Sequence, residues 1–162
     1  MRVIIALLLA PALICVCSSA ATSQSSGDLA AIKRFIKNQE AKHSGRAYED
    51  YQSVVTGDLN HDGVNDAAVL YTMEALDSNN YVQYLTVFIR RSGRLVPVAS
   101  EEVGGKNYRT ADLRLIRNGL IFFDTLDYKD TDASCCPSIK GQTRYSLVGR
   151  KLKEVERPLK DR

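Results

Sequence analysis

The apolar positions near the start of the chain recur at the spacing of a helix. They fall at Leu29, Ile32, Phe35 and Ile36. This spacing predicts one amphipathic α-helix over about residues 28–42, with Asp28 or Ser26 as the residue that caps its first turn. The apolar stripe is narrow and the charged face is modest, so we expect a structural helix that packs on a sheet and not a membrane-surface helix.

After residue 50 the pattern changes to short apolar runs that are separated by turn residues. These runs predict eight strands, at residues 51–56, 67–73, 81–90, 95–102, 113–117, 120–126, 144–148 and 152–156. Three of the turns contain Ser92-Gly93, Asn118-Gly119 and Gly149-Arg150, which suit two-residue hairpins. Connections this short join antiparallel neighbours, because a parallel crossover needs a much longer segment.

The expected fold class is therefore α+β and mostly β. An N-terminal helix is followed by an antiparallel meander of about eight strands. The sequence leaves open whether the meander closes into a sandwich, a barrel or a partial propeller, because all three can be built from short antiparallel strands.

An export signal is predicted over residues 1–20. Arg2 precedes an apolar run that ends at Val16, and small residues follow at positions 18–21. The run is too short to span a hydrocarbon core of about 30 Å. We expect cleavage after Ala20 or Ala21, and a periplasmic or secreted protein with no transmembrane segment after processing.

Two cysteines, Cys15 and Cys17, lie near the end of this run, where a lipid anchor would be attached. The residues before them, Ile14 and Val16, are large, whereas a lipid-attachment signal has a small residue there. A lipid anchor is therefore not expected.

The rest of the chain is expected to form one domain. Residues 21–27 are small and polar and suit a flexible leader, and residues 28–162 are long enough for a single globular domain with its own core. The chain has 22 basic and 19 acidic residues, of which only Arg2 lies in the predicted signal. A balance so close to neutrality argues against a nucleic-acid partner.

The segment from Asp58 to Asp66 has the spacing of a calcium-binding loop, D-x-N-x-D-G-x-x-D. Calcium takes six to eight oxygen ligands, and alternate positions of a tight loop can direct theirs inward. The predicted ligands are the side chains of Asp58, Asn60, Asp62 and Asp66 and the carbonyl oxygen of Val64. Gly63 permits the sharp turn after the third ligand. We expect calcium here in a mainly structural role; the alternative is a polar turn without metal.

The flanks of this loop distinguish it from a helical EF-hand. Val69 stands where an EF-hand has a bidentate glutamate, and strand-like sequence lies on both sides. In these features residues 54–70 resemble the FG-GAP repeats of integrin-type propellers, in which the same spacing binds calcium in a hairpin. The resemblance implies a calcium-binding hairpin loop. It covers a single copy, so it does not imply a propeller, which needs several.

A second distinctive segment lies between two predicted strands. Cys135 and Cys136 are adjacent and precede Pro137. In an oxidising compartment they can form a strained, easily reduced ring, remain as two thiols, or bridge to another chain. They are candidates for a loop staple or a redox pair. The acids of this segment are candidates for binding a partner surface or a second cation, or else form a solvated loop: Asp124, Asp127, Asp130 and Asp132.

The layout of this region also resembles a known group. An Asn-Gly hairpin, an apolar strand, an acidic loop, Cys-Cys-Pro and a final strand with an aromatic residue follow one another within residues 80–156. This order resembles a group of small exported bacterial proteins, the Cys-Cys-Pro periplasmic proteins, whose function is uncharacterised. The resemblance implies a similar fold and export, and it implies no activity.

The motifs of common enzyme classes are absent from the sequence. It contains no nucleophile elbow, Cys-x-x-Cys pair, glycine-rich phosphate loop or His-Glu zinc motif, and its two histidines are His43 and His61, the latter at an outward-pointing loop position. We therefore expect a non-enzymatic, calcium-binding protein of the cell envelope whose partner is another envelope protein. The alternatives are an inhibitor or immunity protein against a secreted cell-wall hydrolase, and an enzyme that uses the cysteine pair or carboxylates.

Overall fold

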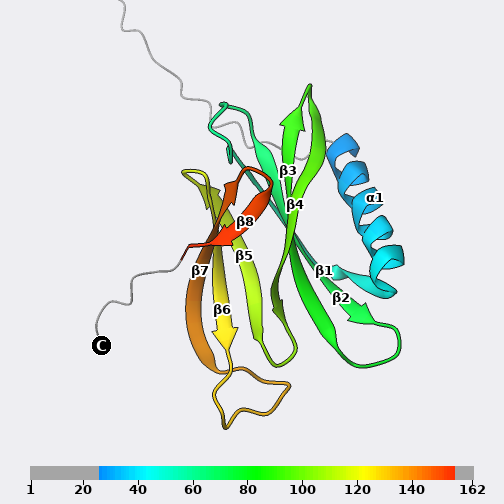
Figure 1. Cartoon of the computed structure of the whole chain (residues 1–162), viewed down its shortest axis with the longest axis vertical. Coiled ribbons are helices and arrows are strands. Elements are labelled where there is room, and N and C mark those ends of the chain that lie inside the picture. Colours follow the sequence, from blue (N-terminus) through cyan, green and yellow to red (C-terminus); the bar gives the residue numbers. More distant parts are fainter. Residues whose placement is uncertain (1–25, 156–162) are drawn as a thin grey trace, which may run out of the picture.

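The computed structural model describes residues 26–155 (Figure 1). One helix, α1 (Ser26–His43), is followed by eight strands. The strands are β1 (Gly45–Gly57), β2 (Asp66–Ala75), β3 (Tyr81–Arg91), β4 (Arg94–Gly105), β5 (Arg109–Arg117), β6 (Leu120–Asp127), β7 (Ile139–Val148) and β8 (Lys151–Glu154). The predicted export signal, residues 21–25 of the predicted leader, and residue 156 of the last predicted strand lie outside the described residues.

The predicted helix and the eight predicted strands are confirmed, in meander order and with antiparallel pairing throughout. Some boundaries differ. Ser26 and Gly27 belong to α1 and not to a leader, and β1 and β7 begin at Gly45 and Ile139 because they pair with β2 and β6 over this extra length. Asn118 and Gly119 both have positive φ angles, 52° and 72°, as the predicted hairpin turn requires.

The helix α1 packs on the outer face of β1–β4. Ile32 and Ile36 are buried against a cluster made of Ala67, Val69, Tyr71, Met73, Phe88 and Leu95. Phe35 contacts Phe88 edge to face, with ring centroids 5.3 Å apart. The prediction that Leu29 lies on the apolar face is wrong, since it is 41% exposed. The neighbouring Asp28 is buried instead, because the Arg90 guanidinium donates two hydrogen bonds to its carboxylate, at 2.7 and 3.0 Å.

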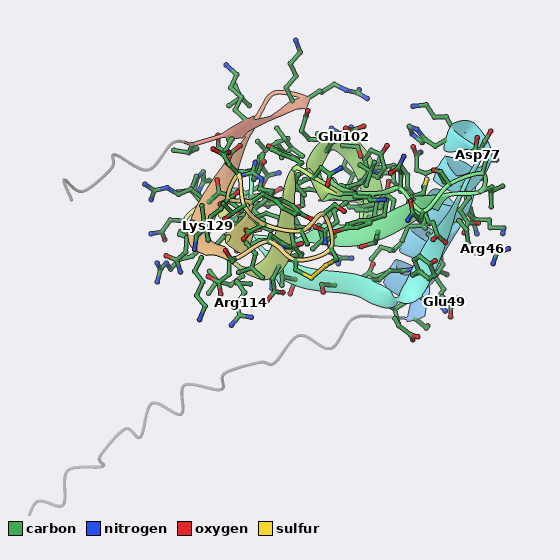
Figure 2. All side chains as sticks on the ribbon, turned by 90° about the horizontal axis from the view of Figure 1, so that it is seen from below. Arg46, Glu49, Asp77, Glu102, Arg114 and Lys129 are labelled. Carbon is green, nitrogen blue, oxygen red and sulfur yellow. A yellow bond between two sulfur atoms is a disulfide. The ribbon has the colours of Figure 1, made fainter. Side chains whose placement is uncertain are left out.

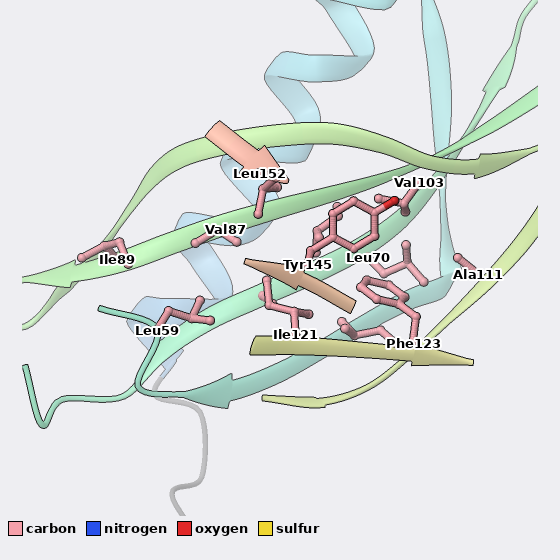
Figure 3. Close-up of a cluster of buried hydrophobic side chains, with 13 residues drawn as sticks. Leu59, Leu70, Val87, Ile89, Val103, Ala111, Ile121, Phe123, Tyr145 and Leu152 are labelled. Carbon is pink, nitrogen blue, oxygen red and sulfur yellow. The ribbon is translucent and has the colours of Figure 1, made fainter. Parts of the chain in front are cut away.

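The sheet is open, since its order runs from β1 to β8 without closing on itself. β4 and β5 share a single register pair, Gly105 with Arg109, so the sheet bends sharply between them. The bend divides it into two halves, β1–β4 and β5–β8, which face each other across the main core (Figure 3). This core consists of Leu59, Ala68, Leu70, Leu85, Val87, Ile89, Val103, Ala111, Leu113, Ile121, Phe123, Tyr145 and Leu152. The question of closure is thereby answered in favour of an open, folded sheet and against a barrel.

A side chain replaces the missing backbone pairs at the bend. The amide of Gln83 accepts a hydrogen bond from the backbone N–H of Ala111 at 2.7 Å and donates one to its carbonyl at 3.1 Å. This approach requires a glycine at position 104, because a Cβ there would lie 2.4 Å from the Gln83 Oε1 atom. Gln83 therefore joins the two halves where β4 and β5 separate.

The short strand β8 is held in place by a buried arginine. The Arg109 guanidinium donates to both carboxylate oxygens of Glu154, at 2.9 and 2.8 Å, and to the hydroxyl of Tyr145 at 3.1 Å. The hydrogen bond from Arg109 holds the pKa of the Glu154 carboxyl below its ordinary value, and burial raises the pKa of the Tyr145 hydroxyl. These contacts, which we call the Arg109 latch, tie β5, β7 and β8 together.

Candidate functional site

The predicted calcium loop, residues 58–66, lies at the hairpin between β1 and β2, and its last residue is the first of β2. The last residue of β1, Gly57, pairs with the first residue of β2, Asp66. Strands on both sides confirm that this loop is not part of a helical EF-hand. Leu59 reaches from the loop into the main core and is buried there, so the loop is anchored between the two halves of the sheet.

Asp66 closes the base of the loop and is completely buried. Its Oδ2 atom accepts the backbone N–H of Leu59 at 3.0 Å, and its Oδ1 atom accepts the backbone N–H of Arg90 at 2.8 Å. Burial raises the pKa of the Asp66 carboxyl despite these two hydrogen bonds, and the nearby charges of Asp62 and Asp58 raise it further. A negative charge at this position is therefore costly unless a positive charge lies close to it.

The other predicted ligand side chains lie on the exposed part of the loop and bind its backbone. Asp58 accepts the N–H groups of Asp62 and Gly63 at 3.2 and 2.9 Å. Asn60 Oδ1 accepts the same N–H of Asp62 at 3.1 Å. Asp62 accepts the N–H of Val64 at 2.8 Å and the Asn60 side-chain amide at 2.8 Å. The Gly63 N–H is the main reason that the pKa of the Asp58 carboxyl is lowered, so this group stays ionised.

The donor set of the loop suits a hard cation. It offers three carboxylates and one amide oxygen within nine residues, and calcium prefers such oxygen ligands. Each carboxylate oxygen that accepts one N–H keeps a further lone pair, so these hydrogen bonds do not use up the ligand capacity of the loop. Within residues 26–155, however, no three His, Cys, Asp or Glu side chains are gathered in the arrangement of a metal centre. The loop in this conformation is held by its own hydrogen bonds.

His61 contacts the opposite half of the sheet. It has a φ angle of 62°, and its side chain lies so close to the β5–β6 turn that a Cβ at Gly119 would be 2.7 Å from the His61 Nε2 atom. Gly57, at the start of the loop, similarly packs against Ile116 of β5. The loop thus bridges both halves, which sequence reasoning missed; the apolar Leu59 inside a polar motif was the available signal.

Arg90 links the loop to the helix. Its backbone N–H binds Asp66, its Nε atom donates to the carbonyl of Asn65 at 3.0 Å, and its guanidinium forms the ion pair with Asp28 of α1. The first turn of α1 is therefore connected through one side chain to the base of the loop. Arg90 lies 24 residues beyond Asp66 in the chain, and nothing in the loop motif points to it.

The four acids of the second predicted site do not gather at one place. Asp124 lies on the outward side of β6, where Arg114 and Gln142 bind it at 3.1 and 2.9 Å. Asp132 folds back to organise its own loop, since it accepts the N–H groups of Lys129 and Ser138. Asp127 accepts the hydroxyl of Thr125, and Asp130 is exposed. Each acid therefore has a separate environment.

Cys135 and Cys136 form a disulfide in the exposed loop between β6 and β7. This loop projects beyond the end of the sheet (Figure 1). The hydroxyl of Tyr128 donates to the carbonyl of Ser134 at 2.8 Å, and Asp132 binds Ser138, so hydrogen bonds brace the loop on both sides of the cysteine pair. The pair is accessible to a thiol reagent from solvent.

In the part of the chain that the structure covers, residues 26–155, no helix is both long and apolar enough to cross a membrane.

Comparisons with known proteins found no relative of this chain. No protein-family model, no curated protein and no solved structure matches the chain.

Proposed function

We propose that this protein is an exported, non-enzymatic binding protein of the cell envelope, and that calcium bound by residues 58–66 stabilises its fold. The observation that carries the calcium proposal is the hairpin loop between β1 and β2, which places three carboxylates and one amide oxygen within nine residues. A completely buried carboxylate has its pKa raised by burial and by two other carboxylates close by. A divalent cation bound by these carboxylates would relieve this repulsion and add to the positive charge that Arg90 places near Asp66.

The residues that would hold calcium are Asp58, Asn60, Asp62 and Asp66, with the Val64 carbonyl. The role of the ion there is structural, because the loop joins several parts of the fold. Leu59 lies in the main core, His61 contacts the β5–β6 turn, and Arg90 connects the loop to α1. Holding the loop in one conformation therefore holds the helix and both halves of the sheet together. Ligand binding to the folded state alone stabilises it by mass action.

The binding role rests on the sequence and on the surface. The sequence carries an export signal pattern and lacks the nucleophile elbow, Cys-x-x-Cys, phosphate-loop and zinc motifs of common enzymes. A sheet with a projecting, internally braced loop such as the β6–β7 loop is suited to presenting fixed side chains to another protein. Fixed loops lose little conformational entropy on binding, which favours affinity.

The calcium proposal is tested by calorimetric titration of the protein with calcium. We expect one ion per chain, and at least about tenfold weaker binding in Asp62→Ala, because one of three carboxylate ligands is lost. The matched control is Asp77→Ala, which removes an exposed aspartate from the β2–β3 turn and should leave the affinity unchanged. No binding to the unaltered protein, or equal weakening in both variants, would contradict the proposal.

A second candidate function is inhibition of a secreted cell-wall hydrolase. The β6–β7 loop favours it, because the loop projects from one end of the molecule (Figure 1) and is braced by hydrogen bonds from Tyr128 and to Asp132. Such a loop can enter an active-site cleft. The test is residual activity of wall glycosidases, amidases and peptidases at equimolar protein. Inhibition that disappears in Asp130→Lys supports this candidate, and full activity of all three classes contradicts it.

A further inference from the structure

The outer face of β5–β7 is open to solvent, in contrast to the outer face of β1–β4, which α1 covers. Outward-pointing side chains form rows across the three strands. The strand register gives these rows as Arg117–Leu120–Ser146, Leu115–Phe122–Arg144, Asp112–Asp124–Gln142 and Thr110–Leu126–Lys140. We call this surface the β5–β7 face. Arg114, which is labelled in Figure 2, lies beside these rows, and its side chain is exposed.

The two acids of the β5–β7 face share one arginine, which balances one of their two negative charges. Arg114 pairs with Asp112 at 2.8 Å and with Asp124 at 3.1 Å, and Gln142 donates a further hydrogen bond to Asp124 at 2.9 Å. The remaining charges are all positive. They belong to Arg117, Lys140 and Arg144, none of which has a carboxylate within ion-pair distance among the described side chains.

Two of these cations flank an aromatic ring. The Arg117 guanidinium lies over the Phe122 ring, 5.1 Å from its centroid, and Arg144 is the register partner of Phe122 on the other side. Stacking holds a guanidinium plane in place while its N–H edge stays available for a carboxylate. Leu115, beside Phe122, is 42% exposed, so an apolar contact surface adjoins the two arginines.

The face is also hollowed. A shallow depression of about 400 Å³ is bordered by Arg114, Arg117, Phe122 and Arg144. A second, of about 550 Å³, adjoins it and is bordered by Lys140 and Leu126. The two adjoin each other, since Asp124 and Gln142 border both of them.

We propose that the β5–β7 face docks an acidic segment of a partner protein. Carboxylates of that segment pair with Arg117 and Arg144, and an apolar side chain of it packs on Leu115 and Phe122. Arginine and aromatic side chains are enriched in protein interfaces, and they carry most of the binding energy there. A polyphosphate has no apolar group that could pack on the exposed Leu115 and the partly buried Phe122. This inference deepens the binding role proposed above and rests on it, but it does not depend on calcium.

The test is fluorescence anisotropy of the protein with a labelled peptide in which glutamates alternate with leucine and phenylalanine. The double variant Arg117→Glu/Arg144→Glu should bind at least about tenfold more weakly, because attraction becomes repulsion at the centre of the face. The matched control is Arg91→Glu/Arg94→Glu, which changes the net charge equally at the exposed β3–β4 turn and should retain the affinity. The milder Arg117→Gln/Arg144→Gln provides a second variant in case the charge reversal prevents folding.

Two results would overturn the inference. One is equal weakening by both charge-reversal variants, which would show that net charge alone is responsible. The other is that polyphosphate or anionic lipid vesicles bind at Arg117 and Arg144 more tightly than the peptide does. The ligand of this face would then be a polyanion or a membrane surface and not a protein segment. A calcium titration of the same variants separates the two proposals, since loss of peptide binding with calcium binding intact bears only on the β5–β7 face.

Discussion

The two halves of the sheet share one core but differ in what lies on their outer faces. The first eight residues of β2 are all buried, because the main core covers one face of this strand and α1 covers the other. β6 instead alternates buried and more exposed residues, since only its inner face meets the core. The first half is therefore covered on both faces, by the main core and by α1. The second half leaves its outer face exposed, and this is where we propose that a partner docks.

The largest expected effect comes from a matched pair of phenylalanines on the outer faces. Phe88 is fully buried under α1, whereas Phe122 on the β5–β7 face is only partly buried. Phe88→Ala should lower the free energy of unfolding by about 3–5 kcal/mol, and Phe122→Ala by less than about 1 kcal/mol. Urea denaturation measures both. Equal losses would mean that the two outer faces are not as different as the burial of these side chains indicates.

A smaller effect is expected at the Arg109 latch, which belongs to the second half. Glu154→Gln leaves the buried Arg109 guanidinium without its carboxylate and should cost about 2 kcal/mol of stability near neutral pH. The folded-state pKa of Glu154 is depressed, so its contribution is present above the ordinary value of 4.5 and disappears as the pH falls through the folded-state pKa.

The pH profile of unfolding separates this contribution from a general effect of charge. The difference between the unaltered protein and Glu154→Gln should shrink in acid, below about pH 4.5. The control Glu101→Gln, at an exposed position of β4, should follow the unaltered protein at every pH. A constant difference across the pH range would argue against the ion pair as the source of the stability.

The smallest effect is expected from the disulfide. Cys135 and Cys136 are adjacent, so their bond encloses almost no chain and restricts the unfolded state little. Reduction by a dithiol should shift the thermal midpoint by less than about 2 °C. It should also leave the anisotropy of the acidic peptide unchanged, because the β5–β7 face lies on the strands. A large loss of stability on reduction would give this loop a role in the fold that its position does not explain.

Most of the fold could be predicted from the sequence, because local patterns determine it. Helical spacing of Ile32 and Ile36 located α1, and the turn dipeptides Ser92-Gly93 and Asn118-Gly119 located two hairpins. All four of these turn residues have positive φ angles in the structure. The bend of the sheet was not predicted, since it depends on a contact between Gln83 and Ala111, which are 28 residues apart. A meander with a bend and one without it have the same local periodicity.

The candidate site was predictable in its residues but not in its environment. The motif assigned Asp66 the same role as Asp58 and Asp62, whereas the structure buries Asp66 completely and leaves the other two on the exposed part of the loop. The difference arises from Arg90 and Leu59, whose N–H groups reach the Asp66 carboxylate. Contacts across the sheet are fixed by register, and a nine-residue motif carries no information about them.

The measurement that tests calcium stabilisation most directly is the thermal midpoint of the protein in calcium and in chelator. At calcium concentrations far above the dissociation constant, the account predicts a rise of about 5 °C or more in the unaltered protein and in Asp77→Ala. It predicts no rise in Asp58→Ala or Asp62→Ala. The same midpoint with calcium and with chelator in the unaltered protein would contradict the account and identify residues 58–66 as a polar turn held by hydrogen bonds alone.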